Sequence, residues 1–210
     1  MSSAYLRGPL DFAVDGSTCS VSGADMQLVA LGVYGRNGRR RDVEFRRGAL
    51  NILTGKSKTG KSAILDIAEF CLGRDKVTIP TGGISDNAAW YYALIQFGDE
   101  RVVICRPNPE GASTAHAMVR TGGPDLGAPQ FSELQVNADT DVVRDMLTER
   151  LGIEAFTIEA SSSSLRASFD VTARQALFYC FQSQGEIASR DTLFHRQVNR
   201  DVSATIKDSL

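Results

Sequence analysis

The sequence has few of the residues that build metal centres, disulfide frameworks or membrane spans. Its 210 residues include four cysteines and two histidines, and the cysteines lie far apart without a C-x-x-C pair. This spacing matches neither a zinc site nor a disulfide framework, and it favours reduced thiols. No apolar run approaches the roughly 18 residues that a membrane span needs. We therefore expect a cytoplasmic protein with no membrane partner.

The N-terminal region also lacks the continuous apolar core of a signal peptide, because serine, glycine and aspartate are scattered through it. We expect residues 1–25 to form a mobile leader and residues 26–210 to form one domain. The formal net charge of -2 excludes a chain that coats nucleic acid over its whole surface. A local basic patch remains compatible with that charge.

The strongest motif is the glycine-bounded segment from Gly55 to Ser62, which reads G-x-x-x-x-G-K-S. The apolar residues at 50–54 come directly before it and predict a buried strand. After it, apolar residues recur at helical spacing through 64–71, and Gly73 stands where a helix C-cap belongs. A strand, a glycine loop and a helix in this order form the context in which the motif holds a nucleotide triphosphate.

The chemistry of such a loop follows from the charge of the triphosphate. Glycine lets the main chain come close, so that backbone N–H groups surround the phosphates together with the positive end of the helix. By this pattern Lys61 bridges the β- and γ-phosphates of ATP, and the Ser62 hydroxyl ligates magnesium. Lys56 and Lys58 either point into solvent or reach a phosphate. The predicted phosphate-binding residues are Gly55, Lys56, Ser57, Lys58, Thr59, Gly60, Lys61, Ser62 and Ala63.

Two strands are expected before the motif and a β-hairpin after it. The segments 26–34 and 42–45 predict strands separated by a polar turn. Downstream, "WYYALIQF" and "RVVICR" flank the three residues 98–100, a connection typical of a hairpin. Trp90 and its two tyrosine neighbours are expected at the start of a buried strand.

The C-terminal half predicts an irregular insertion followed by two helices. Proline and glycine are dense between residues 107 and 140. Asp141 is expected to cap a helix that runs to Leu151, and a capping-box spacing from Thr172 predicts a second helix.

The segment "LVALGVYGRNGRRRDVEFRRGALNILTGKSKTGKSAILDIAEFCLG" resembles the N-terminal lobe of the SMC, RecN and SbcC-type ATPases, which belong to the ABC-ATPase class. In that plan, Tyr34-Gly35-Arg36 matches the end of the first strand and Val43-Glu44-Phe45 matches the second strand. The stretch from Gly48 to Gly55, with Asn51, matches the element before the phosphate loop. The chain is also similar to a bacterial family of SMC-like ATPases. The resemblance covers residues 26–106 and 141–210.

The resemblance implies an α/β P-loop NTPase fold, with an ABC-ATPase-like N-terminal lobe and an antiparallel β-hairpin subdomain. In those ATPases a basic residue after the first strand approaches the nucleotide phosphates, which makes Arg36 a candidate. "CFQSQGEIASRDTLF", at 180–194, is similar to their Q-loop. This similarity implies that Gln184 ligates magnesium and orients the attacking water, with Gln182 as an alternative.

Two parts that hydrolysis requires are missing from the sequence: an apolar strand that ends in Asp-Glu, and a signature of the L-S-G-G-Q kind. In SMC-like proteins both lie in a C-terminal lobe beyond a long coiled coil, and this sequence stops near the expected start of that coiled coil. The resemblance therefore implies an ATPase only once a C-terminal lobe, on this or a second polypeptide, completes it. It also implies ATP-gated dimerisation of heads on DNA, in repair or defence, with a nuclease as a further partner.

Other interpretations remain open from the sequence. ParA and MinD-type ATPases carry G-K-G-G-x-G-K-[ST], and Lys56 matches their signature lysine, although Ser57 and Lys58 replace both glycines. A non-catalytic nucleotide sensor would bind ATP only to stabilise a surface. Six arginines between Arg36 and Arg47 would either contact DNA phosphates or form a solvated turn.

Overall fold

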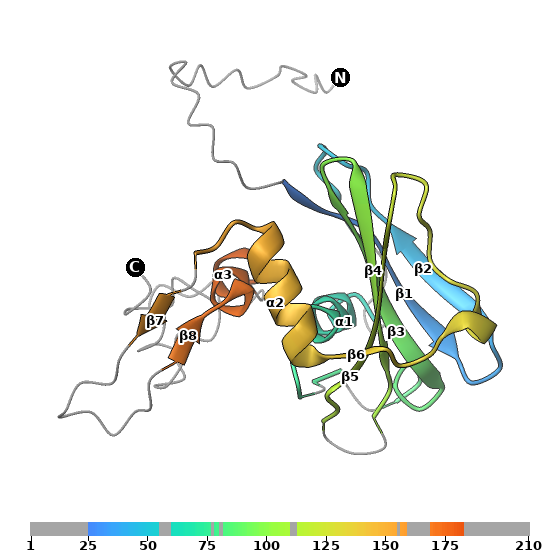
Figure 1. The fold of residues 1–210 in the computed structure, drawn as a ribbon. Coiled ribbons are helices and arrows are strands. Elements are labelled where there is room, and N and C mark those ends of the chain that lie inside the picture. The colour runs from blue at the N-terminus through green and yellow to red at the C-terminus, as the bar shows by residue number, and fades with distance from the viewer. Residues whose placement is uncertain are drawn as a thin grey trace, which may run out of the picture.

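The computed structural model describes residues 25–54, 60–76, 78–79, 82–109, 113–154, 156–158 and 169–182. The expected leader therefore lies outside the described residues, apart from residue 25. One face of a large sheet carries the first helix, and the other helices and a small second sheet follow outward from it (Figure 1). Within the described residues, no helix combines the length and the apolar character needed to cross a membrane.

The large sheet has six strands in the order β2-β1-β3-β4-β5-β6, and each neighbouring pair is antiparallel. Phe97 lies opposite Glu100, so the predicted hairpin is confirmed with a connection of two residues instead of three. Gly98 in this connection has a φ of 54°, which suits glycine. The strands are β1 (Met26–Gly35), β2 (Arg40–Glu44), β3 (Ala88–Phe97), β4 (Glu100–Pro107), β5 (His116–Gly122) and β6 (Ala138–Asp139).

The central strands β3 and β4 are buried on both faces, which explains their nearly continuous apolar sequences. On one face, residues such as Ile95 and Ile104 join the main core around the first helix. On the other face, Tyr34 and Tyr92 belong to a second core that the chain near Leu126 covers. The Tyr34 hydroxyl fixes this cover by donating to the Pro129 carbonyl at 2.7 Å.

The helix predicted after the motif is confirmed as α1 (Ala63–Cys71), and Gly73 ends it as predicted. Gly73 has a φ of 99° and donates its N–H to the Phe70 carbonyl, while the N–H of Arg74 donates to the Glu69 carbonyl. This pair of bonds is a Schellman motif, which satisfies carbonyls that the helix leaves open. The buried face of α1 consists of Ala63, Ile67, Ala68, Phe70 and Cys71.

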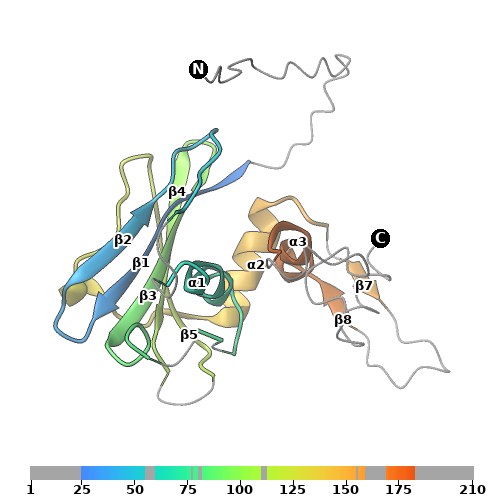
Figure 2. The same ribbon diagram turned by 180° about the vertical axis from the view of Figure 1, so that it is seen from behind.

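Two further helices follow the sheet (Figure 2). The first, α2, is capped by Asp139 and not by the predicted Asp141 two residues later, because the Asp139 carboxylate accepts from the N–H groups of Asp141 and Val142 at 3.0 Å each. The N–H of Ala173 then donates to Thr148 Oγ1 at 2.9 Å, which joins the start of the third helix to α2. The elements are η1 (Phe131–Glu133), α2 (Thr140–Arg150), β7 (Phe156–Ile158), β8 (Phe169–Val171) and α3 (Ala173–Cys180).

Two predictions about local structure are wrong. Residues 50–54 form no strand, and Leu50 and Ile52 are 87% and 74% exposed. A strand needs a neighbour for its backbone hydrogen bonds, and no described strand pairs with this segment. The segment 107–140 is not irregular throughout, because β5 and β6 lie within it and extend the sheet. Its described prolines and glycines lie at and just beyond the end of β4, at the end of β5 and in the cover over the second core.

The described architecture is thus a mixed α/β fold built on an antiparallel sheet. The described residues do not by themselves establish a P-loop NTPase fold.

Candidate nucleotide-binding site

The predicted phosphate loop is described only at its C-terminal end. Gly60, Lys61, Ser62 and Ala63 lead into α1, whereas the residues from 55 to 59 lie outside the described residues. Gln184 also lies outside them, and Gln182 is two residues beyond the end of α3. Of the predicted ligands, Lys61 and Ser62 therefore lie at the start of α1.

Within the described residues, the Ser62 hydroxyl at the start of α1 makes no capping hydrogen bond. The N–H of Ala63 donates to the Gly60 carbonyl at 3.1 Å, and that of Ile64 donates to the Lys61 carbonyl at 3.2 Å. Gly60 has a φ of 86°, a conformation that strongly favours glycine. Ser62 occupies the N-cap position, is exposed, and makes no side-chain capping bond. Its hydroxyl is therefore available to an external ligand.

A turn at residues 82–87 connects this end of α1 to Arg36. The terminal Cδ1 atom of Ile84 lies 2.8 Å from the position that a Cβ atom on Gly60 would take. The Asn87 carbonyl in the same turn accepts from the Arg36 N–H at 2.9 Å. This turn was not predicted, although its Gly82-Gly83 pair is a turn signal.

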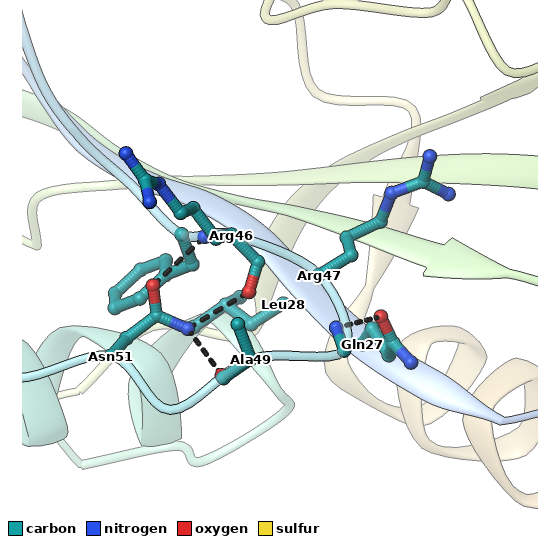
Figure 3. A pocket seen from close by; sticks show the side chains of 8 residues that line it. Gln27, Leu28, Arg46, Arg47, Ala49 and Asn51 are labelled. Atoms are coloured by element: carbon teal, nitrogen blue, oxygen red, sulfur yellow. Dashed lines mark hydrogen bonds between the residues drawn. The ribbon is translucent and has the colours of Figure 1, made fainter. Parts of the chain in front are cut away.

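The Asn51 side chain holds the turn at residues 46–51, before the phosphate loop, through hydrogen bonds to its backbone (Figure 3). Its Oδ1 atom accepts from the Arg46 N–H at 2.8 Å, and its Nδ2 atom donates to the carbonyls of Arg46 and Ala49, both at 2.9 Å. Gly48, with a φ of 62°, donates its N–H to Gln27 Oε1 at 3.2 Å. The Gly48-x-x-Asn51 pattern is therefore a braced turn beside an open pocket of about 230 Å³.

The six arginines of the first hairpin and of the loop after it are all exposed. Arg40 pairs with Asp42 at 2.9 Å and donates to the Ala128 carbonyl at 3.1 Å. Within the described part of the chain, the other five guanidinium groups make no hydrogen bond or ion pair; they belong to Arg36, Arg39, Arg41, Arg46 and Arg47. These five positive charges are available to an anionic partner.

A buried arginine that the sequence did not single out fixes the opposite end of α1. Arg106, on β4, has no exposed surface and donates to the carbonyls of Phe70 and Arg74, both at 2.8 Å. It also donates to the carbonyls of His116, at 3.0 Å, and Thr114, and its guanidinium lies 4.2 Å from the centre of the Phe70 ring. Burial lowers the pKa of Arg106 to about 10, so the group remains charged at neutral pH.

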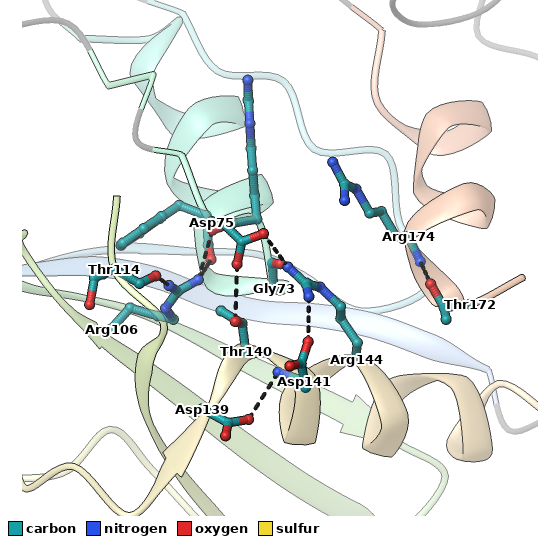
Figure 4. A network of polar contacts seen from close by, with 12 residues as sticks. Gly73, Asp75, Arg106, Thr114, Asp139, Thr140, Asp141, Arg144, Thr172 and Arg174 are labelled. Atoms are coloured by element: carbon teal, nitrogen blue, oxygen red, sulfur yellow. Dashed lines mark hydrogen bonds and ion pairs between the residues drawn. The ribbon is translucent and has the colours of Figure 1, made fainter. Parts of the chain in front are cut away.

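A second arginine ties the same end of α1 to α2 (Figure 4). Arg144 donates to the Gly73 carbonyl at 2.9 Å and to the carboxylates of Asp75 and Asp141, both at 2.6 Å. The Thr140 hydroxyl donates to Asp75 at 3.0 Å. Partial burial opposes ionisation of Asp75, but the hydrogen bonds from Arg144 and Thr140 outweigh it, and the pKa of Asp75 is lowered. Contacts from β4 and α2 thus hold the C-terminal end of α1.

Among the residues that the structure describes, no group of three or more histidine, cysteine or acidic side chains is arranged to hold a metal ion. Comparisons with protein-family models, with curated proteins and with solved structures found no match.

Proposed function

We propose that this chain is the ATP-binding N-terminal lobe of an SMC/SbcC-like ATPase head that acts on DNA through ATP-gated head dimerisation. The chain by itself is incomplete for hydrolysis. One observation carries the proposal: a G-x-x-x-x-G-K-S motif runs directly into α1, where the last glycine has a positive φ and the serine hydroxyl makes no capping bond.

The residues at the start of α1 fit a magnesium–triphosphate ligand. The nine-residue helix presents its positive end, Lys61 adds a full charge, and the exposed Ser62 hydroxyl is available as a neutral oxygen ligand for magnesium. Residues 55–59 would supply backbone N–H groups, and Gln184 would supply an amide oxygen. Bound magnesium would neutralise phosphate charge, and the protein would hold the phosphates in place.

The exposed apolar segment before the loop supports a requirement for a second lobe. Leu50, Ile52 and Leu53 are 87%, 74% and 45% exposed in sequence next to the proposed site. Burying one such side chain fully is worth about 1.5–3 kcal/mol. We propose that this segment packs against the C-terminal lobe, carried on the same or a second polypeptide, that supplies the missing acidic strand and signature.

The arginine surface supports DNA as a partner. Five exposed guanidinium groups that make no ion pair within the described residues lie on the first hairpin and the loop after it. Such groups contact DNA phosphates without reading the base sequence, and their contribution to affinity falls with salt.

Calorimetric titration of the purified chain with ATP and magnesium tests nucleotide binding. We expect wild-type protein to bind, and Lys61→Ala to weaken binding about 10- to 100-fold, because it removes a charge-assisted contact. Lys76→Ala is the matched control, since this exposed lysine lies beyond the end of α1. No magnesium-dependent binding by the wild-type chain, or equal affinity in the Lys61→Ala variant, would refute the proposal.

Phosphate release separates the ATPase from a nucleotide sensor. We expect negligible turnover by this chain alone, and turnover that depends on Lys61 once a polypeptide carrying the C-terminal lobe is added. Turnover should rise further with DNA. Binding without turnover under both conditions would favour a non-catalytic sensor.

A further inference from the structure

The turn at Gly82–Asn87 contacts two separate parts of the proposed site. Ile84 meets Gly60 at the start of α1, and the Asn87 carbonyl holds the Arg36 N–H at the end of β1. These two contacts come from one short segment. Its position therefore affects the spacing between Arg36 and the start of α1, where Lys61 lies.

The turn is well braced internally. The N–H of Asp86 donates to the Gly82 carbonyl at 2.9 Å, and that of Ala88 donates to the Ile84 carbonyl at 3.0 Å, as in one turn of an α-helix. The Asn87 side chain donates to the Gly83 carbonyl at 3.0 Å. These bonds tie the residues of the turn to one another.

Asn108, just beyond the end of β4, anchors the turn to the sheet. Its Nδ2 atom donates to the Ser85 carbonyl at 2.8 Å and to the Ala88 carbonyl at 3.1 Å. Its backbone N–H donates to the Ala89 carbonyl at 2.8 Å. The position of the turn is therefore set by the hairpin β3–β4, which belongs to the most buried part of the molecule.

We propose that Ile84 and Asn108 are positioning residues, which hold Arg36 and the start of α1 at the spacing that suits the terminal phosphates of one ATP molecule. This inference rests on the proposed function. Two cations on separate elements stabilise the same phosphates only while their spacing is maintained, and small displacements weaken such contacts. ADP lacks the γ-phosphate, so its binding depends less on that spacing than the binding of ATP does.

The test compares affinities for magnesium-ATP and magnesium-ADP by calorimetry, and needs no turnover. We expect Ile84→Ala to reduce the preference for ATP over ADP about 3- to 10-fold, as for residues coupled through direct contact. Ile84→Leu, which keeps a δ-carbon, should restore most of the preference. Ile153→Ala is the matched control, because this isoleucine also packs partly buried against the main core but lies after α2.

Two further variants separate positioning from general loss of stability. Asn108→Asp keeps the shape of the side chain but removes both donors to the turn, and should lower the ATP preference in the same direction. In an Arg36→Ala background, Ile84→Ala should change the ATP/ADP ratio by less than about twofold, because the cation that it positions is gone. Thermal unfolding without nucleotide identifies any variant that fails to fold.

The outcomes distinguish this inference from the proposed function. If the wild-type chain binds no ATP, the proposed function fails. If the wild-type chain binds ATP but folded Ile84→Ala and Asn108→Asp variants keep the ATP/ADP ratio of the Ile153→Ala control, the positioning role alone is wrong. Full additivity of Ile84→Ala with Arg36→Ala would equally overturn it.

Discussion

Replacement of Arg106 by methionine tests how the end of α1 is held. Methionine has a similar length and fills the buried space, but it donates no hydrogen bond. The substitution leaves four carbonyl oxygens without this donor, including that of Phe70, which is fully buried. It also removes the cation from the face of the Phe70 ring.

The magnitude follows from those four bonds. Hydrogen bonds to charged groups contribute about 1.5–3 kcal/mol each, but three of these bonds are only partly buried, so we assign about 1 kcal/mol to each. With about 1.5–3 kcal/mol for the buried bond to the Phe70 carbonyl, the expected loss is about 5 kcal/mol, a large fraction of the roughly 5–15 kcal/mol that stabilises a typical domain. Arg106→Lys should recover only part of the loss. An ammonium group still donates hydrogen bonds, but it lacks the planar fork that reaches several carbonyls.

Urea unfolding followed by circular dichroism measures this loss. Arg39→Met is the matched control, because Arg39 is exposed and its guanidinium makes no hydrogen bond or ion pair within the described residues. We expect its stability to stay within about 0.5 kcal/mol of wild type. If the Arg106→Met variant matched this control, the carbonyl-binding account of Arg106 would be refuted.

Three further outcomes follow from local contacts. The hydrogen bond from Arg144 lowers the pKa of Asp75 despite partial burial, so Asp75→Asn should reduce the free energy of unfolding by about 1 kcal/mol or less at neutral pH. This difference in stability from wild type should shrink as the pH falls through and below 3.8, because wild-type Asp75 then becomes protonated. A difference that does not change with pH in urea unfolding would contradict this account. Gly73→Ala, at a φ of 99° and with a Cβ atom 3.0 Å from Arg144 Cγ, should cost about 1–2 kcal/mol, whereas Gly123→Ala, where a Cβ atom meets nothing within 4 Å, should be neutral in the same assay. Ile52→Ser should change the free energy of unfolding of this chain by no more than about 0.5 kcal/mol, because Ile52 is exposed, yet it should weaken pull-down of a C-terminal lobe. A clear loss of stability would show instead that this chain itself buries Ile52.

Local patterns predicted most of the regular elements. The two early strands, the hairpin of β3 and β4, α1 with its glycine cap, and the starts of α2 and α3 all appear close to their expected positions. Each depends on periodicity, capping or turn chemistry within a few residues. The strand β5 was missed because the prolines and glycines around it hid a short segment in which three apolar residues follow one another.

The failed predictions concern contacts between distant residues. The apolar residues at 50–54 looked buried, but burial of a strand depends on a neighbour, and no described strand provides one. Arg106 stood at the end of "RVVICR" with no sign that carbonyls far along the chain would surround it. The turn at 82–87 shows the same limit, because its contacts with Gly60 and Arg36 arise only when the sheet is assembled.

The charge of β2 has a consequence for self-association. This strand lies at one edge of the large sheet, where open backbone groups could pair with another copy of the chain. Four of its five residues are charged, namely Arg40, Arg41, Asp42 and Glu44, and each is exposed. Pairing with another copy there would remove water from these four charged side chains, and that cost disfavours the edge-to-edge pairing that leads to aggregation.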